Sequence, residues 1–117
     1  MVTVIGKPTF LDPREIREGL SLSQERLSAL LKISSKTVLR WEKDNQTPRD
    51  PEVLERLAEL KEIKDLGTLV YTKEGLKEFL STPLPIFGGR SALVLLQLGE
   101  YELVISALAA DFEGTGF

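Results

Sequence analysis

"LSQERLSALLKISSKTVLRWEKDNQTP", residues 22–48, decides how the first half of the chain folds. Ser23 is a favourable N-cap, and three leucines follow it at the i, i+3, i+4 spacing of one helical face (Leu27, Leu30 and Leu31). A break at residues 32–34 separates this helix from a second one that ends at about Asp44. The stretch therefore predicts two short helices joined by a tight turn.

The second helix of this pair has two different faces. At about 100° per residue, Val38 and Trp41 point to one side of the helix. A helix that docks in a DNA major groove needs such an apolar side for packing, and a donor-rich side for base edges and phosphates. On this helix alone, a DNA-reading face and a merely solvated face of a four-helix packing module explain the pattern equally well. The residues on the other side are Ser35, Lys36, Leu39, Arg40 and Lys43.

Further helices are expected on both sides of the pair in the first half. Asp12 is a favourable N-cap residue that precedes proline, and Gly19 is a typical helix stop, so a short first helix is predicted between them. Residues 51–66 carry a buried apolar stripe that predicts a long fourth helix, which Gly67 is expected to end. Residues 68–71 form a short β-prone segment.

The second half also reads as short helices. One helix is expected after the N-cap Thr72, and residues 83–89 are expected to be non-helical because they hold two prolines and two glycines. Another helix starts after Ser91, and Gly99 separates it from a last helix beginning near Tyr101. Apolar surface on helices this short must be covered by a partner or by another copy of the chain.

Composition excludes several classes of protein. The chain has 117 residues, of which 42% are hydrophobic, and it contains no cysteine and no histidine. Disulfides, thiolate zinc sites, cysteine nucleophiles and the usual near-neutral acid–base residue are therefore absent, and we expect no metal, no cofactor and no enzymatic activity. The longest apolar run, residues 92–96, is far below the roughly 20 residues that span a bilayer. We expect a cytoplasmic protein without a membrane partner.

Charge is distributed unevenly along the chain. The net charge is −3, which argues against coating nucleic acid through bulk charge. Residues 23–49 nevertheless hold six basic and three acidic side chains, a local charge of +3, whereas residues 67–117 hold three and six, a local charge of −3. The two halves are thus expected to bind different partners.

Residues 22–48 resemble the Xre-type (lambda-repressor-like) helix-turn-helix family along their whole length, from Leu-Ser-Gln at the start to Trp41-Glu42 and Pro48. Lys32 stands where that family often has glycine, so the turn must adopt a less comfortable backbone conformation. The resemblance implies phosphate contacts from the second and third helices and base reading by the third. The residues expected to bind DNA are Gln24, Ser35, Lys36, Thr37, Leu39, Arg40 and Lys43, with Gln24 and Lys43 on phosphates.

The second half resembles the toxin-binding domain of MbcA/ParS/Xre antitoxins. The matching elements, in order, are Phe79-Leu80, Thr82-Pro83, Gly88-Gly89-Arg90, Leu95-Leu96 and Gly99. Phenylalanine replaces the usual tryptophan at the first of these, and Ala92 stands where proline is common. Without the resemblance, these helices could simply complete a small core.

The resemblance also implies which residues meet the toxin. They are Phe87, Arg90, Asp111, Glu113 and Phe117. Arg90 could equally hold the helices together or contact the partner. The tail from Asp111 is expected to follow the last helix. As in the family, it is expected to lie near the opening of the toxin's active site, where Phe117 would block entry. The alternative is a frayed end without a role.

Together these observations predict an all-α protein with two parts. Residues 1–66 form a lambda-repressor-like helix-turn-helix domain, and residues 67–117 form a small helical domain for toxin binding and dimerisation. The resemblance implies a homodimeric antitoxin that neutralises a toxin, commonly a RES-domain enzyme that consumes NAD, and represses its own operon by binding operator DNA. The alternative is a stand-alone Xre-family transcriptional repressor whose C-terminal helices only dimerise.

Overall fold

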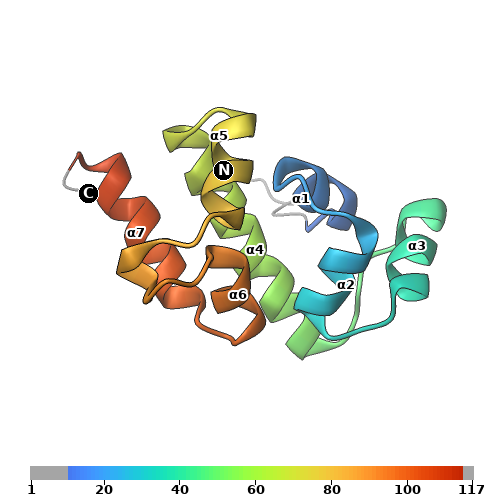
Figure 1. The fold of residues 1–117 in the computed structure, drawn as a ribbon. Helices are drawn as coiled ribbons and strands as arrows, with labels where there is room; N and C mark the ends of the chain where they lie inside the picture. The colour runs from blue at the N-terminus through green and yellow to red at the C-terminus, as the bar shows by residue number, and fades with distance from the viewer. Residues whose placement is uncertain (1–10, 115–117) are drawn as a thin grey trace.

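The structure, a computed structural model, describes residues 11–114. The all-α class is confirmed, because the only β-type pairing among these residues is one isolated bridge between Leu84 and Arg90. Figure 1 shows the order of the helices along the chain. They are α1 (Pro13–Gly19), α2 (Gln24–Leu31), α3 (Ser35–Asp44), α4 (Pro51–Val70), α5 (Lys73–Ser81), the 3₁₀ turn η1 (Pro85–Phe87), α6 (Ala92–Gln97) and α7 (Tyr101–Phe112).

The long helix α4 runs through the middle of the molecule. In Figure 1, α1, α2 and α3 lie on one side of it, and α7 lies on the other. The helices α4 and α7 pack side by side. Two hydrogen bonds show that they run in the same direction: Tyr101 at the start of α7 bonds to Glu62, and Asp111 near its end bonds to Tyr71, just after α4. α3 and the C-terminal end of α7 consequently lie at opposite ends of the molecule (Figure 1).

The helix starts are those that the sequence predicts. Asp12 accepts hydrogen bonds from the backbone N–H groups of Arg14 and Glu15, and Ser23 accepts one from Arg26. Thr72 and Ser91 cap α5 and α6 in the same way. Each such cap satisfies a backbone donor that the first helical turn leaves free, and is worth about 1 kcal/mol.

Gly67 does not end α4, so the predicted end of this helix is wrong. The helix continues to Val70, and residues 68–70 are helical instead of extended. Gly67 is buried, and a Cβ atom placed there would lie only 2.6 Å from the Cδ1 atom of Leu76 in α5. Glycine at this position therefore allows α5 to approach α4 closely, and its role as a helix stop is not used.

Residues 83–89 are not wholly free of helix, which corrects a second prediction. Pro85 opens a single 3₁₀ turn that ends at Phe87. A proline at the first helical position costs little because its missing N–H would have no intrahelical partner there. Gly88 and Gly89, with φ of 68° and 84°, then reverse the chain so that Leu84 and Arg90 pair.

One hydrophobic core extends across the whole described chain. It includes Ile16 and Trp41 from the first helices, Leu57 and Ile63 from α4, and Leu108 from α7. The helix α4 crosses the predicted boundary between residues 66 and 67. The division into two domains at that point stays a prediction.

Within residues 11–114, no helix is both long and apolar enough to cross a membrane.

Candidate DNA and protein interfaces

The outer face of α3 carries the side chains that the sequence predicts for it. Val38 and Trp41 are buried on the opposite side of this helix. Thr37 is half-buried, its hydroxyl lies 3.0 Å from that of Ser34, and together with Arg40 it borders a hollow between α3 and the loop that follows. The exposed residues of the outer face are Ser35, Lys36, Leu39, Arg40 and Lys43. The face itself is thus confirmed, and the contacts of its residues with DNA stay predictions.

The turn between α2 and α3 has the backbone conformation expected from its sequence. Lys32 lies in the left-handed region, with φ 60° and ψ 45°. Ser34 then caps α3 by accepting a hydrogen bond of 3.2 Å from the N–H of Thr37. A non-glycine residue in the left-handed region is strained, so the turn between α2 and α3 forms at some cost in stability.

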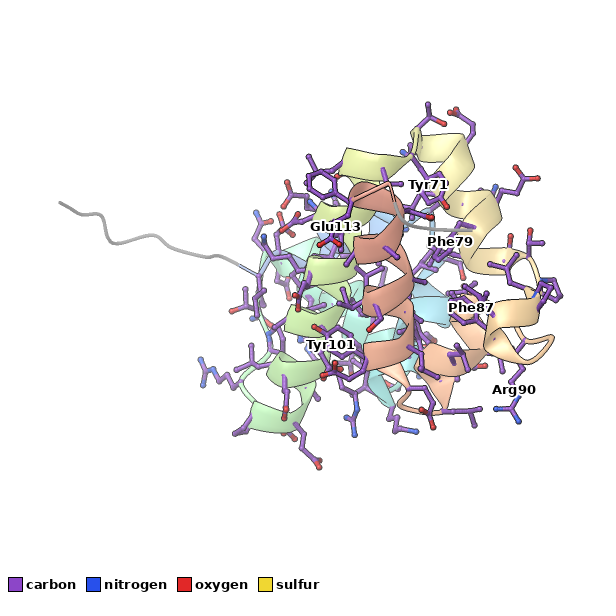
Figure 2. The ribbon with its side chains drawn as sticks, turned by 90° about the vertical axis from the view of Figure 1, so that its left-hand side faces the viewer. Tyr71, Phe79, Phe87, Arg90, Tyr101 and Glu113 are labelled. Carbon is purple, nitrogen blue, oxygen red and sulfur yellow. The ribbon has the colours of Figure 1, made fainter. Side chains whose placement is uncertain are left out.

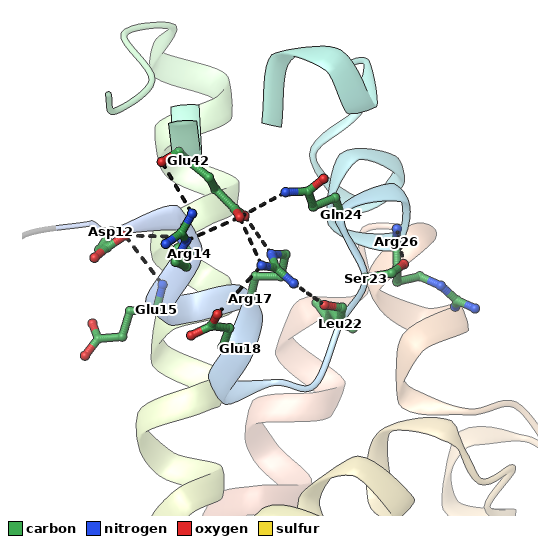
Figure 3. Close-up of polar contacts among 10 residues, drawn as sticks. All are labelled: Asp12, Arg14, Glu15, Arg17, Glu18, Leu22, Ser23, Gln24, Arg26 and Glu42. Carbon is green, nitrogen blue, oxygen red and sulfur yellow. Dashed lines mark hydrogen bonds and ion pairs between the residues drawn. The ribbon is translucent and has the colours of Figure 1, made fainter. Parts of the chain in front are cut away.

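A buried carboxylate lies where α1, α2 and α3 meet, and sequence reasoning missed it. The side chain of Glu42 is only 3% exposed, and Figure 3 shows it at the centre of the polar contacts. Arg17 donates to it through Nε and Nη2, at 2.6 and 3.0 Å, and Gln24 donates through Nε2 at 3.0 Å. Arg14, half in solvent, donates through Nε at 3.4 Å.

This network is ionic at neutral pH. Burial raises the pKa of Glu42, but hydrogen bonds from Arg17 and Gln24 and the charges of Arg17 and Arg14 together outweigh burial, so its pKa lies below the ordinary value. The hydrogen bond to Glu42 is also the main reason why the pKa of Arg17 is raised. Arg17 lies 25 residues from Glu42 in the sequence, so no local pattern could have paired the two residues.

Gln24 is held by this network at the first position of α2. One N–H of its side-chain amide is used by Glu42, which leaves the second N–H and the carbonyl oxygen for another partner. The structure thus fixes the direction of the amide before any ligand binds. The predicted contact between Gln24 and a phosphate stays a prediction.

Three aromatic rings connect the helices of the second half. Tyr71 stacks on Phe79 with ring centroids 5.4 Å apart, and Phe79 meets Phe87 edge to face at 6.1 Å. Figure 2 shows the three rings in succession between α4, α5 and η1. Phe87 is buried, so a direct contact between its ring and a partner would require the ring to leave the core. Its evident contribution is to hold the turn that precedes Arg90.

Arg90 is exposed, and its guanidinium forms no ion pair within residues 11–114. Its backbone carbonyl accepts a hydrogen bond of 3.1 Å from the N–H of Leu84, so the side chain projects from a fixed turn. In Figure 2, Arg90 and Glu113 lie at opposite ends of this half of the molecule. The structure therefore does not bring these two predicted toxin-binding residues together.

Asp111 does not follow the last helix, which corrects the predicted start of the tail. It lies inside α7 and accepts a hydrogen bond of 2.7 Å from the hydroxyl of Tyr71. Burial and the neighbouring Asp111 raise the pKa of Tyr71 to about 12. Glu113 is exposed directly after α7, and Phe117 lies outside the described residues.

At its other end, α7 is held by Tyr101. The hydroxyl of this residue donates to Glu62 of α4, and burial together with Glu62 raises its pKa. Two tyrosine–carboxylate bonds therefore fasten α7 to α4, and neither pair is close in the sequence.

Apolar side chains are exposed on several elements after the middle of α4. Val94 of α6 and Leu98, the C-cap residue that follows this helix, lie one helical turn apart and are both exposed. Others are Leu69, Ile86, Leu103 and Phe112. Their exposure agrees with the expectation that the short C-terminal helices cannot bury all of their apolar side chains within a single chain.

Residues 14–60 match the helix-turn-helix family designated HTH_3. The match includes nearly all of α1, the whole of α2 and α3, and the first half of α4. Residues 14–60 are a helix-turn-helix domain. The match confirms the predicted motif and agrees with the expectation of a DNA-binding regulator and not an enzyme.

The fold of nearly the whole chain also occurs in a solved structure. A chain of the crystal structure of the MbcT-MbcA toxin-antitoxin complex of M. tuberculosis superimposes with a TM-score of 0.75. The similarity covers 90% of this chain and 94% of that chain, at 24% sequence identity. It shows that the helices after the helix-turn-helix domain belong to a fold already known in combination with it. A comparison with curated proteins found no match.

Proposed function

We propose that this protein is an antitoxin that binds a cognate toxin through its C-terminal half and represses its own operon through the helix-turn-helix domain. The observation that carries the proposal is the fold similarity to a chain of a toxin-antitoxin complex, because it extends over both halves and 90% of this chain. The helix-turn-helix match of residues 14–60 supports the DNA-binding part independently.

In the DNA-binding part, α3 enters the major groove with its exposed face. Ser35, Lys36, Thr37, Leu39 and Arg40 read base edges, and hydroxyl and basic side chains are suited to the donor and acceptor pattern found there. Gln24 and Lys43 bind phosphates and set the position of the helix on the duplex. Since one such helix reads few base pairs, a homodimer on a palindromic operator would supply the length of site that specific binding requires.

In the toxin-binding part, the exposed apolar side chains and Arg90 form the contact surface. Leu98 and Val94 offer apolar area, and the exposed guanidinium of Arg90, which has no ion-pair partner in residues 11–114, suits a carboxylate on the partner. Glu113 and the residues that follow it extend the contact toward the toxin's active site. A RES-type enzyme that consumes NAD is the proposed toxin, on the strength of the family resemblance in residues 79–99.

The alternative is a repressor whose C-terminal helices only dimerise. The same exposed apolar residues of α6 and α7 favour it, since a second copy of the chain could cover them as well as a toxin. The two functions predict different effects of a charged residue introduced on this surface. In an antitoxin it would weaken toxin binding. In a plain repressor it would weaken dimerisation and hence operator binding.

Two exposed variants test the proposal in cells that express the product of the neighbouring gene as the candidate toxin. Leu98→Asp should lose neutralisation of growth arrest and co-purification with that product, and should still bind operator DNA. Arg40→Ala should neutralise normally but lose about 1–3 kcal/mol of binding free energy on the operator. A wild-type protein that binds the operator without neutralising the toxin, together with a loss of operator binding in Leu98→Asp, would favour the repressor. A full-length protein that neither rescues growth nor co-purifies would refute the antitoxin function.

A further inference from the structure

Leu39 stands apart from the other exposed apolar residues. Seven large hydrophobic side chains are exposed in residues 11–114, and six of them lie at residue 69 or later. Leu39 alone lies in the first three helices, where its side chain is 52% exposed. Among the described residues it belongs neither to the core nor to the partly buried hydrophobic residues that pack on the core.

The neighbours of Leu39 on α3 are all polar. Ser35 and Lys36 lie one turn before it, and Lys43 lies one turn after it on the same exposed face. A leucine in the middle of such a face gains nothing from water and forms no hydrogen bond. Its position is explained if the surface that α3 meets offers an apolar group among polar ones.

A DNA major groove offers one such group. The base edges in this groove present hydrogen-bond donors and acceptors, and the C5-methyl group of thymine is the apolar feature among them. We infer that Leu39 is a specificity-determining residue that contacts a thymine methyl in each half-site of the operator. This inference rests on the proposed DNA-binding function and names one of the bases that α3 reads. Arg40, the next residue, suits the O6 and N7 atoms of guanine, so the thymine lies in the same half-site as a guanine.

Deoxyuridine provides a direct test because it pairs as thymine does and lacks only the methyl group. The probe is a duplex with the sequence of the protein's own promoter, limited to the region that the protein protects in a footprint. A set of such duplexes is made, and each duplex carries deoxyuridine in place of one thymine. Wild-type protein should lose affinity about fourfold at one thymine in each half-site, as expected for one buried methyl group. Leu39→Ala should bind the unmodified duplex more weakly by a similar factor, and the same deoxyuridine should then have no further effect.

Glu78→Ala is the control, since Glu78 is exposed on α5, outside the first three helices, and belongs to neither of the two proposed interfaces. It should keep the deoxyuridine sensitivity of the wild type. Neither variant removes a buried side chain, so both should unfold at the wild-type temperature. Specific binding that no deoxyuridine weakens, or a sensitivity that Leu39→Ala retains, would overturn the role of Leu39 while leaving operator binding intact. A protein that does not distinguish its promoter from random DNA would instead refute the proposed repression.

Discussion

The two ends of this molecule are stabilised in different ways. Where α1, α2 and α3 meet, a buried carboxylate, Glu42, is bound by two arginines and a glutamine. At the other end, stacked aromatic rings and two tyrosine–carboxylate bonds fasten α5 and α7 to α4. The first end presents a polar face with a single exposed leucine, and the second exposes several large apolar side chains. The comparison indicates one surface for a charged polymer and another for a protein.

The largest expected effect concerns the buried charge at the DNA-binding end. Arg17→Met should lower the free energy of unfolding by about 3 kcal/mol or more, because it leaves the carboxylate of Glu42 buried without its main partner. Urea denaturation followed by circular dichroism measures the loss. Arg14→Met is the control, since this guanidinium is 54% exposed and lies 3.4 Å from Glu42, and it should cost at most about 1 kcal/mol. Equal losses for the two variants would show that burial is not the reason for the effect.

The pH dependence of stability separates Glu42 from Glu59, a carboxylate of α4 that feels the charge of Glu102 in α7. Because the pKa of Glu42 is lower in the folded state, its charge stabilises the fold at neutral pH, and this contribution is lost as the pH falls through about 4.3 toward the folded value. Glu42→Gln should therefore cost about 2 kcal/mol at pH 7 and progressively less in acid.

Glu59 should show the opposite sign. Burial, and then the charges of Glu55, Glu102 and Glu62 against the opposing charge of Arg56, raise its pKa in the folded state, so its ionised form weakens the fold at neutral pH. Glu59→Gln should stabilise the protein at pH 7, and the benefit should disappear below about pH 4. Unfolding free energies of both variants between pH 3 and 7 provide the check. Slopes of the same sign would contradict this comparison.

A smaller effect is expected from the bond that holds the end of α7. Tyr71→Phe keeps the stacking on Phe79 and removes only the hydroxyl that donates to Asp111, which should cost about 1 to 1.5 kcal/mol. The affinity for operator DNA should not change, because α3 lies at the far end of the molecule. Neutralisation of the toxin should weaken if the end of α7 takes part in it. Thermal unfolding, DNA binding and growth rescue measured on one preparation distinguish these effects. A loss of DNA affinity equal to the loss of neutralisation would show that the two ends are not independent.

Features set by neighbouring residues could be predicted from the sequence, whereas contacts between distant residues could not. The caps at Asp12 and Ser23 depend on residues two or three positions away, and they were predicted correctly. The network of Glu42 and the bond from Tyr71 to Asp111 join residues 25 and 40 positions apart, which no local pattern reveals.

Gly67 illustrates the same limit. Because glycine is common at helix ends, the sequence predicted that Gly67 would end α4. In the structure, the residue is glycine because Leu76 of α5 approaches it too closely for a Cβ atom. The exposed face of α3 was predictable because helical periodicity alone determines which residues share a face. The exposed side chains of α6 and α7 depend on how far the neighbouring helices cover them, which periodicity does not determine.

The smallest expected effect lies in the turn before α3. Lys32 holds a left-handed conformation that glycine adopts without strain, so Lys32→Gly should relieve roughly 1 to 2 kcal/mol of backbone strain. The greater freedom of glycine in the unfolded chain offsets part of this gain, which leaves a net stabilisation of about 0.5 kcal/mol. The side chain of Lys32 is exposed and has no partner among the described residues, so its removal should cost little. Lys36→Gly, in the first turn of the α3 helix, is the contrasting variant and should destabilise by up to about 1 kcal/mol. If both glycines lowered the unfolding temperature alike, the turn would not be strained, and the helix-turn-helix angle would have to be set by packing of Val38 and Trp41 alone.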